Sequence, residues 1–265
     1  MAFTKIIQLS DLHLTGTGQA LFGARPGERL AAAIDLIQRD HRDAALCLLT
    51  GDLAEAGDDA AYAELARLTS RLGMPVHPMV GNHDDRAALL RHFPAAGDGS
   101  GFVQRALDTP AGHLLLLDTL DPGRGSGLLC AERLAWLKSQ SWRHATPTLL
   151  AMHHPPLAVG IPAMDQYALR NPEEFWAVIA PHRHRIRHIL LGHLHRPLGG
   201  NWRGISISCT HSPNHQVALD LAALPPDGAV PGCQEPASFS VILIDDDSVV
   251  VHHQAMAEGG KRFPL

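Results

Sequence analysis

The segment IIQLSDLH (Ile6–His13) decides the fold class, because it joins an apolar run of strand length to an Asp-x-His cluster. The same arrangement recurs along the chain, where further apolar runs end at nitrogen- and oxygen-bearing side chains. These later clusters are Gly51-Asp52, Gly81-Asn82-His83-Asp84, His153-His154-Pro155-Pro156 and Gly192-His193-Leu194-His195. Sheets of α/β proteins bind ligands at the ends of their strands. The clusters therefore predict one site assembled from several strand ends.

Apolar runs and helical patterns alternate over most of the chain. The runs predicted as strands are Ile6–Leu9, Leu46–Leu49, Val76–Val80, Leu114–Leu117, Thr148–Met152, Ile189–Leu191 and Ile205–Ser208. The hydrophobic spacing typical of helices occurs in Arg29–Arg39, Ala60–Leu72 and Glu132–Lys138. Such alternation predicts a layered α/β fold.

The C-terminal part follows another pattern. Phe239–Ile244 and Val249–His253 form two predicted strands, joined by an Asp-rich turn with no helix between them. The sheet system is therefore expected to be mixed. We predict a single domain over residues 1–265, with a cap or dimerisation segment within 219–265. The Gly- and Pro-containing loops Leu120–Leu128, Pro155–Pro172 and Leu224–Pro236 are where substrate selectivity is expected.

The composition excludes several classes of protein. The chain is 45% hydrophobic and carries a formal net charge of -5, so it lacks the basic field of a protein that binds nucleic acid or anionic membranes. Four cysteines lie far apart without a CxxC pair, which argues against zinc knuckles and disulfide frameworks. With no signal-peptide pattern and no apolar stretch of about 18 residues, we expect a cytoplasmic protein outside the membrane.

The polar clusters suit a metal site. A spacing of two places Asp11 and His13 on one face if the chain is extended there, and the same holds for His193 and His195. The glycines before Asp52, Asn82 and His193 permit tight turns. Any one cluster alone is a common turn composition. Together they favour a metal centre, and ligands that are all nitrogen or oxygen suit Mn, Fe, Co or Zn.

The order D-x-H, G-D, G-N-H-D, H and G-H-x-H resembles the calcineurin-like metallophosphoesterase family. The resemblance spans about Ile6 to His195. The stretches Gly81–Asp85, Met152–Leu157 and Met164-Asp165 are most similar to bacterial glycerophosphodiesterases and class III cyclic-nucleotide phosphodiesterases. The resemblance implies a sandwich of two mixed β-sheets flanked by helices, with a binuclear metal centre at the strand ends.

The family's ligand roles fall on matching positions of this chain. The resemblance implies that one metal is held by Asp11, His13, Asp52 and His195, and the other by Asp52, Asn82, His153 and His193. Asp52 would bridge, because two nearby divalent ions need a shared anion to offset their repulsion. Water bound to such metals has a lowered pKa and supplies the hydroxide that attacks phosphorus.

Three further histidines have roles implied by the family. His83 is expected to contact the phosphate or protonate the leaving group; the alternative is a structural histidine paired with Asp84. His215 is similar to a substrate-side histidine of the glycerophosphodiesterase branch, with a hydrogen-bonded loop histidine as the alternative. In an extended segment only one of His153 and His154 faces the metals, and the family's pattern selects His153.

The function implied is hydrolysis of a small phosphodiester, either a cyclic nucleotide or a glycerophosphodiester. The nearest alternative is a phosphomonoesterase or phosphoprotein phosphatase, because the same metals hydrolyse both kinds of ester. A nuclease is disfavoured by the acidic charge balance. A non-catalytic protein-binding scaffold is the alternative from another class, although every expected ligand position is filled. A homodimer or higher homo-oligomer is also considered.

Overall fold

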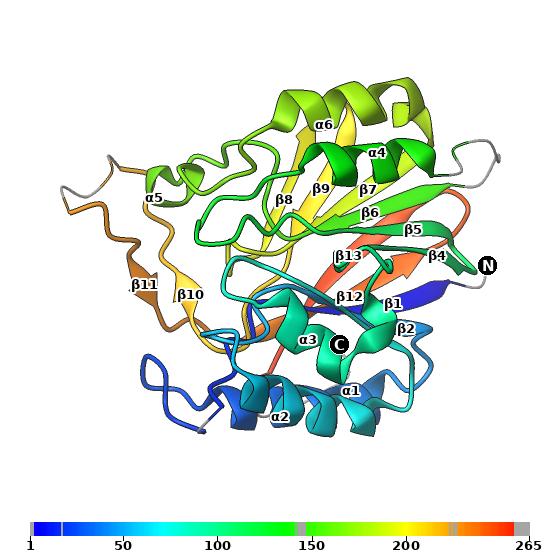
Figure 1. Ribbon diagram of the computed structural model, residues 1–265. Coiled ribbons are helices and arrows are strands. Elements are labelled where there is room, and N and C mark those ends of the chain that lie inside the picture. The colour runs from blue at the N-terminus through cyan, green and yellow to red at the C-terminus, as the bar shows by residue number, and fades with distance from the viewer. Residues whose placement is uncertain are drawn as a thin grey trace, which may run out of the picture.

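Two mixed sheets pack against each other in the computed structural model, which describes residues 3–256 apart from 17, 141, 143–146, 223, 225 and 226 (Figure 1). The first sheet has the order β13-β12-β1-β2-β3. Its strands are β1 (Thr4–Leu9), β2 (Leu46–Thr50), β3 (Val76–Met79), β12 (Ser238–Ile244) and β13 (Val249–Ala255). The parallel strands β1, β2 and β3 end at the same edge.

The second sheet has the order β4-β5-β6-β7-β9-β8. Its strands are β4 (Arg105–Thr109), β5 (Gly112–Leu117), β6 (Thr148–Met152), β7 (Ile186–Leu191), β8 (Leu198–Trp202) and β9 (Ile205–Cys209). The strands β5, β6, β7 and β9 run parallel. A separate two-stranded ribbon pairs β10 (Gln216–Val217) with β11 (Gly232–Cys233). The expected mixed sandwich is confirmed.

The central core lies between the two sheets. Ile6, Leu48 and Ile242 of the first sheet belong to one buried cluster with Leu149 and Leu190 of the second. Removing these side chains from water is the main force that holds the sheets together. Because helices cover the outer faces as well, the central strands are buried on both sides, and they read as continuous apolar runs.

Helices cover the outer face of each sheet (Figure 1). α1 (Pro26–Asp40) and α2 (Asp59–Thr69) lie on the first sheet, and α4 (Ala131–Ser139) and α6 (Pro172–Ile179) lie on the second. The shorter helices are α3 (Arg86–His92), α5 (Pro162–Asp165) and the 3-10 segments Ser70–Leu72, Pro94–Ala96 and Ala180–Arg185. None of the described helices has both the length and the apolar character needed to cross a bilayer.

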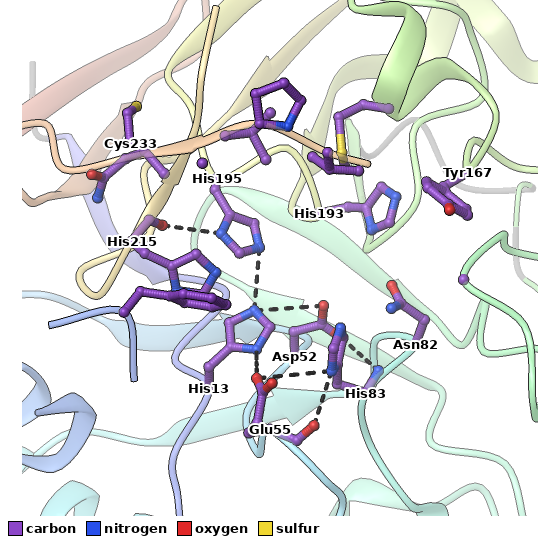
Figure 2. Close-up of a pocket in the computed structure, with 18 of the residues that line it drawn as sticks. His13, Asp52, Glu55, Asn82, His83, Tyr167, His193, His195, His215 and Cys233 are labelled. Carbon is purple, nitrogen blue, oxygen red and sulfur yellow. Dashed lines mark hydrogen bonds and ion pairs between the residues drawn. The ribbon is translucent and has the colours of Figure 1, made fainter. Parts of the chain in front are cut away.

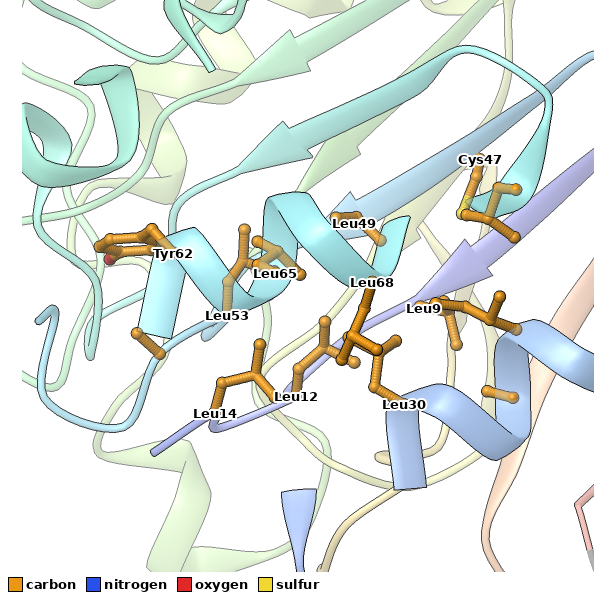
Figure 3. Close-up of a cluster of buried hydrophobic side chains, with 14 of the residues drawn as sticks. Leu9, Leu12, Leu14, Leu30, Cys47, Leu49, Leu53, Tyr62, Leu65 and Leu68 are labelled. Atoms are coloured by element: carbon orange, nitrogen blue, oxygen red, sulfur yellow. The ribbon is translucent and has the colours of Figure 1, made fainter. Parts of the chain in front are cut away.

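Local sequence explains where α2 begins and which face it buries. Asp58 caps the helix by accepting a hydrogen bond from the amide of Ala61 at 3.0 Å. Leu65 and Leu68 then fall on the face that packs toward the first sheet, beside Leu30 of α1 (Figure 3). This packing fixes the loop between β2 and α2, which carries Asp52.

The predicted C-terminal hairpin is confirmed, and it belongs to the first sheet. β12 pairs antiparallel with both β13 and β1, with Ile242 opposite Ile6. The end of the chain therefore lies beside the strand that leads to Asp11. The strands β4 and β8 and the helices α3 and α6 were not predicted; β8 is rich in glycine, and β4 alternates half-buried and exposed residues instead of forming an apolar run.

Candidate metal centre

The backbone at the strand ends is left-handed, not extended. Asp11, His13, Asp52, His193 and His195 have φ angles of 55, 47, 50, 70 and 53°. The extended geometry considered for the pair Asp11 and His13 and for the pair His193 and His195 is therefore wrong. Non-glycine residues seldom adopt this conformation, and such residues gather at functional sites where the surrounding structure enforces them.

Backbone hydrogen bonds between neighbouring loops enforce this conformation. The amide of Asp11 donates to the carbonyl of Gly51, and the amide of His13 donates to the carbonyl of Asp52, both at 2.9 Å. The loops after β1 and β2 thus run alongside each other. In consequence, the side chains of Asp11, His13 and Asp52 share one position at the sheet edge.

Glycines allow the two sheets to meet closely at this edge. Gly51 has a φ of 94°, so at this position glycine permits the tight turn that was expected. At Gly192 the reason is space, because a Cβ atom would lie 2.6 Å from the carbonyl oxygen of Thr50. The loop after β7 therefore passes directly over the end of β2.

Asp11, His13, Asp52 and His195 form the first group of potential ligands, with one ligand atom of each within 4.8 Å of the others. His13 Nδ1 lies 2.6 Å from Glu55 Oε2, and His195 Nδ1 lies 3.0 Å from the carbonyl oxygen of His215. Both acceptors require the proton on Nδ1, which leaves a lone pair on each Nε2. These two Nε2 atoms face each other at 3.2 Å (Figure 2). A metal cation bound by both Nε2 atoms would satisfy these lone pairs.

A second group lies on the other side of Asp52. His153 Nδ1 donates to the carbonyl oxygen of Thr50 at 2.8 Å, so the neutral ring presents a lone pair on Nε2. This Nε2 lies 3.3 Å from Asp52 Oδ2 and 3.3 Å from His193 Nδ1. Asp52 Oδ2 is also 3.8 Å from His13 Nε2, which places Asp52 between the two groups.

Two buried oxygens of the site lack a hydrogen-bond donor. Asp11 Oδ2 and Asn82 Oδ1 have no partner among the residues that the structure describes. Buried acceptors are normally satisfied, so each such atom calls for a specific explanation. Two divalent cations, one at each oxygen, would satisfy these acceptors together with the imidazole lone pairs, and the donor set fits Mn, Fe, Co or Zn chemically.

Burial and opposite charges shift the protonation of the site. Burial raises the pKa of Asp11 to about 6. Burial disfavours the charged forms of Asp52 and His153, but their attraction outweighs it, holding the pKa of Asp52 well below its usual range and raising that of His153 to about 9. Burial lowers the pKa of His195 to about 3, with His13 as a further cause. Without metals, the site therefore holds a proton on His153.

His83 is placed beside the site by two hydrogen bonds. Its amide donates to Asp52 Oδ1 at 2.9 Å, and its Nδ1 donates to the carbonyl oxygen of Glu55 at 2.9 Å. The side chain is 38% exposed. Asp84 instead accepts from the backbone amides of Leu53, Ala54 and Gly81, so the alternative that pairs it with His83 is wrong.

The structure brings both members of the His153–His154 pair to the second group, contrary to the expectation that only one faces it. His154 Nδ1 lies 2.8 Å from Thr119 Oγ1, and its ring lies 4.7 Å from that of His193. Its Nε2 is buried without a described partner. His153 alone has the short contact to Asp52.

A cavity of about 760 Å³ has His13, Asp52, Asn82, His193 and His195 on its floor, whereas Asp11 and His153 are fully buried and do not line it. Its walls include Phe22, Gly125, Met164, Tyr167, Val217, Val230 and Cys233. All three loops expected to contribute selectivity therefore supply lining residues, although residues 225 and 226 of the third lie outside the described part. His215 also lines the cavity, with its ring 4.9 Å from that of His13 and 4.7 Å from that of His195.

Two residues of the site, Glu55 and Phe22, were not predicted from the sequence. Glu55 contacts His13 and His83 but belongs to no recognisable cluster; its only signal is a carboxylate three positions after Asp52. Phe22 lies in a stretch without strand or helix periodicity. Nothing in the sequence indicated that either side chain faces the site.

Comparisons with known proteins agree with this geometry. Residues 4–197 match the family model for calcineurin-like phosphoesterases. The chain is 39% identical to a probable cyclic nucleotide phosphodiesterase of Rhodopseudomonas palustris, over 98% of this chain and 96% of that protein. It is 31% identical to the 3′,5′-cyclic adenosine monophosphate phosphodiesterase CpdA of Escherichia coli, over 87% of this chain and 84% of that protein.

A solved structure with low sequence identity also supports the fold. The dimetal phosphatase from Danio rerio superposes with a TM-score of 0.73, covering 96% of this chain and 97% of that chain at 14% identity. At this identity the likeness concerns the fold alone. Taken with the family model and the two relatives, the convergent His and Asp clusters show that the chain belongs to the calcineurin-like phosphoesterase family.

Proposed function

We propose that the protein hydrolyses a small phosphodiester, with a cyclic nucleotide as the preferred substrate class, using two divalent metal ions. The observation that carries the proposal is the pair of imidazole lone pairs on His13 and His195, which face each other beside buried carboxylates. The names of the two relatives support the substrate class. A glycerophosphodiester is the alternative within the same reaction type.

The proposed ligand sets follow the two groups around Asp52. One ion would be held by Asp11, His13, Asp52 and His195, and the other by Asp52, Asn82, His153 and His193. The position of Asp52 Oδ2 between His13 and His153 supports a bridging role. We propose Mn, Fe, Co or Zn as the native metals, because all the donors are nitrogen or oxygen.

When bound, the ions would generate the nucleophile from water and offset the charge that develops on the phosphate. The chain's own residues would position the substrate. The carbonyl oxygen of Glu55 holds His83 Nδ1, and the ring lines the cavity, where it can contact a phosphate oxygen or, in its imidazolium form, give a proton to the leaving oxygen. His215 is proposed as a substrate-side contact.

A substrate panel tests this proposal. The metal-loaded protein is expected to hydrolyse 3′,5′-cyclic adenosine monophosphate and bis-p-nitrophenyl phosphate faster than p-nitrophenyl phosphate, with each of the four metals tried in turn. A preference for the monoester would support the phosphatase alternative. Failure to hydrolyse any ester in a broad panel would instead support a non-catalytic scaffold.

We further propose a cytoplasmic protein made of a single domain, with the part of residues 219–265 that precedes β12 acting as a cap. Val230 and Cys233 support the cap, because both line the cavity. The four free cysteines support the cytoplasmic location, because disulfides are rare in that compartment. Homo-oligomerisation through the exposed Leu219 and Leu221 is a related proposal, which light scattering tests.

A further inference from the structure

Phe22 occupies the tip of a very tight turn at the mouth of the cavity. Leu21 and Ala24 exchange two backbone hydrogen bonds, of 2.8 and 3.0 Å, across the turn. Phe22 and Gly23 both have positive φ angles, of 49 and 82°. Glycine adopts this conformation easily, whereas a bulky aromatic residue seldom does. The chain therefore holds Phe22 in a conformation that local preference does not explain.

The ring of Phe22 is not part of the hydrophobic core. The residue is 66% exposed, whereas Tyr62, Phe175 and Phe239 are among the most completely buried side chains. Phe22 lines the cavity, and its ring centroid lies 4.7 Å from that of His215. An exposed aromatic ring at the mouth of a polar site is a feature of binding surfaces.

The backbone of the Phe22 turn is held from the other side of the cavity mouth. Gln234, which directly follows β11, donates its side-chain amide to the carbonyl oxygen of Phe22 at 2.7 Å. The turn and the β10–β11 ribbon thus form one connected wall, to which Val217 and Val230 add apolar surface. The wall is apolar and aromatic, whereas the floor is made of charged and imidazole groups.

The ring of His215 lies between the floor and this wall. His215 contacts Phe22 on one side and the ring of His13, at 4.9 Å, on the other. A ligand whose phosphate lies over the floor can therefore extend an attached group toward Phe22. A flat aromatic group fits this wall, because any nucleobase can stack on an aromatic side chain.

We propose that Phe22 is a specificity-determining residue that stacks against the base of a nucleoside phosphodiester. The proposal rests on the proposed function and sharpens it, because a glycerophosphodiester has no planar group and gains nothing from the ring. Phe22 contributes to the affinity for the base. It takes no part in the chemical step.

Two substitutions separate stacking from simple hydrophobic contact. Phe22→Leu keeps an apolar side chain without a π face, and Phe22→Trp keeps the π face. The substrates are 3′,5′-cyclic adenosine monophosphate and its analogue with hydrogen in place of the base. Phe22→Leu is expected to raise KM for the nucleotide about 5- to 50-fold, and that for the base-free analogue less than about 2-fold, with kcat little changed.

Matched controls keep the result specific. Phe22→Trp is expected to retain a wild-type KM. Phe3→Leu, at another exposed phenylalanine that precedes β1 at the end opposite Asp11, is expected to change neither substrate's KM. Equal losses on both substrates in Phe22→Leu, or a change in mass by light scattering, would overturn the proposal in favour of a structural or interface role.

A binding measurement distinguishes failure of this proposal from failure of the proposed function. Calorimetry compares adenosine 5′-monophosphate with ribose 5-phosphate on the metal-loaded protein, without any need for hydrolysis. The wild type is expected to prefer the nucleotide, and Phe22→Leu to reduce that preference about 5-fold or more. An unchanged preference overturns the stacking role even if phosphodiesters are hydrolysed. A reduced preference supports it even if they are not.

Discussion

The cavity has a floor and a rim that are built in different ways. The floor is the cluster of the seven proposed ligands, of which Asp11 and His153 are fully buried and do not line the cavity: Asp11, His13, Asp52, Asn82, His153, His193 and His195. The rim consists of residues 21–24 and the described residues of 216–234. Asp11 and His153 are 0% exposed, and the floor is hydrogen-bonded across both sheets. In the rim, Phe22 and Leu219 are 66 and 61% exposed. A rigid floor suits chemistry, which needs fixed geometry, and an exposed rim suits selectivity.

The largest effect is expected for Asp52→Asn, which removes the carboxylate that lies between the two ligand groups. Both metals should bind weakly, and kcat/KM should fall by more than about 1,000-fold. Elemental analysis and a phosphodiesterase assay check this. Asp59→Asn, at an exposed carboxylate of α2, is the control. Retention of two metals by Asp52→Asn would remove the basis for a bridging role.

His83→Ala tests whether a residue beside the floor contributes to chemistry without holding a metal. Turnover is expected to fall about 100-fold, because a positioned proton donor is lost, while the metal content persists. Elemental analysis and kcat are measured together. His252→Ala, at an exposed histidine of β13, serves as the control. Unchanged turnover would assign His83 to structure alone.

Glu55→Gln should weaken the binding of one metal ion and leave that of the other little changed. Glu55 contacts Nδ1 of His13 and so fixes the proton that leaves Nε2 free. We expect about 10- to 100-fold weaker binding of one metal ion, since such supporting carboxylates tune their histidine ligands. Stepwise dissociation constants from calorimetry measure this. Equal weakening of both ions would contradict the proposed division of ligands.

The affinity of the floor for metal should rise with pH. Burial opposes a charge on His153, but Asp52 raises its pKa to about 9, so a proton occupies this ligand at lower pH and must be displaced. Apparent affinity is therefore expected to increase about tenfold per pH unit as the pH rises toward that pKa. Titrations with Mn between pH 6 and 8 test the sign. Affinity that falls over this range would contradict it.

The smallest effect is expected from the rim. Gln234→Ala removes the hydrogen bond that holds the Phe22 turn. A bond of this kind contributes about 1 kcal/mol, so KM for a cyclic nucleotide should rise about 3- to 5-fold, with metal content unchanged. Gln140→Ala, at the end of α4, is the control. A loss of metal would show that floor and rim are not independent.

The contrast between floor and rim also explains which features could be predicted from the sequence. The floor residues follow apolar runs that are buried on both faces, so their places at strand ends were predictable, and the fold class with them. The left-handed backbone at Asp11 and His13 was not predictable, because it depends on hydrogen bonds to a loop about 40 residues away. The two-residue strands β10 and β11 are too short for any periodicity, and the position of Phe22 depends on Gln234.

The pairing of β12 with β1 has a consequence for biosynthesis. Thr4 lies opposite Ile244, so the second partner of the first strand is synthesised long after that strand. Until then β1 can pair only with β2, and one edge of the strand that leads to Asp11 stays open. Contacts so distant along the chain form slowly. The metal centre is therefore expected to mature only once β12 has been synthesised, so nascent chains that lack this strand are unable to hold the metals in their final geometry.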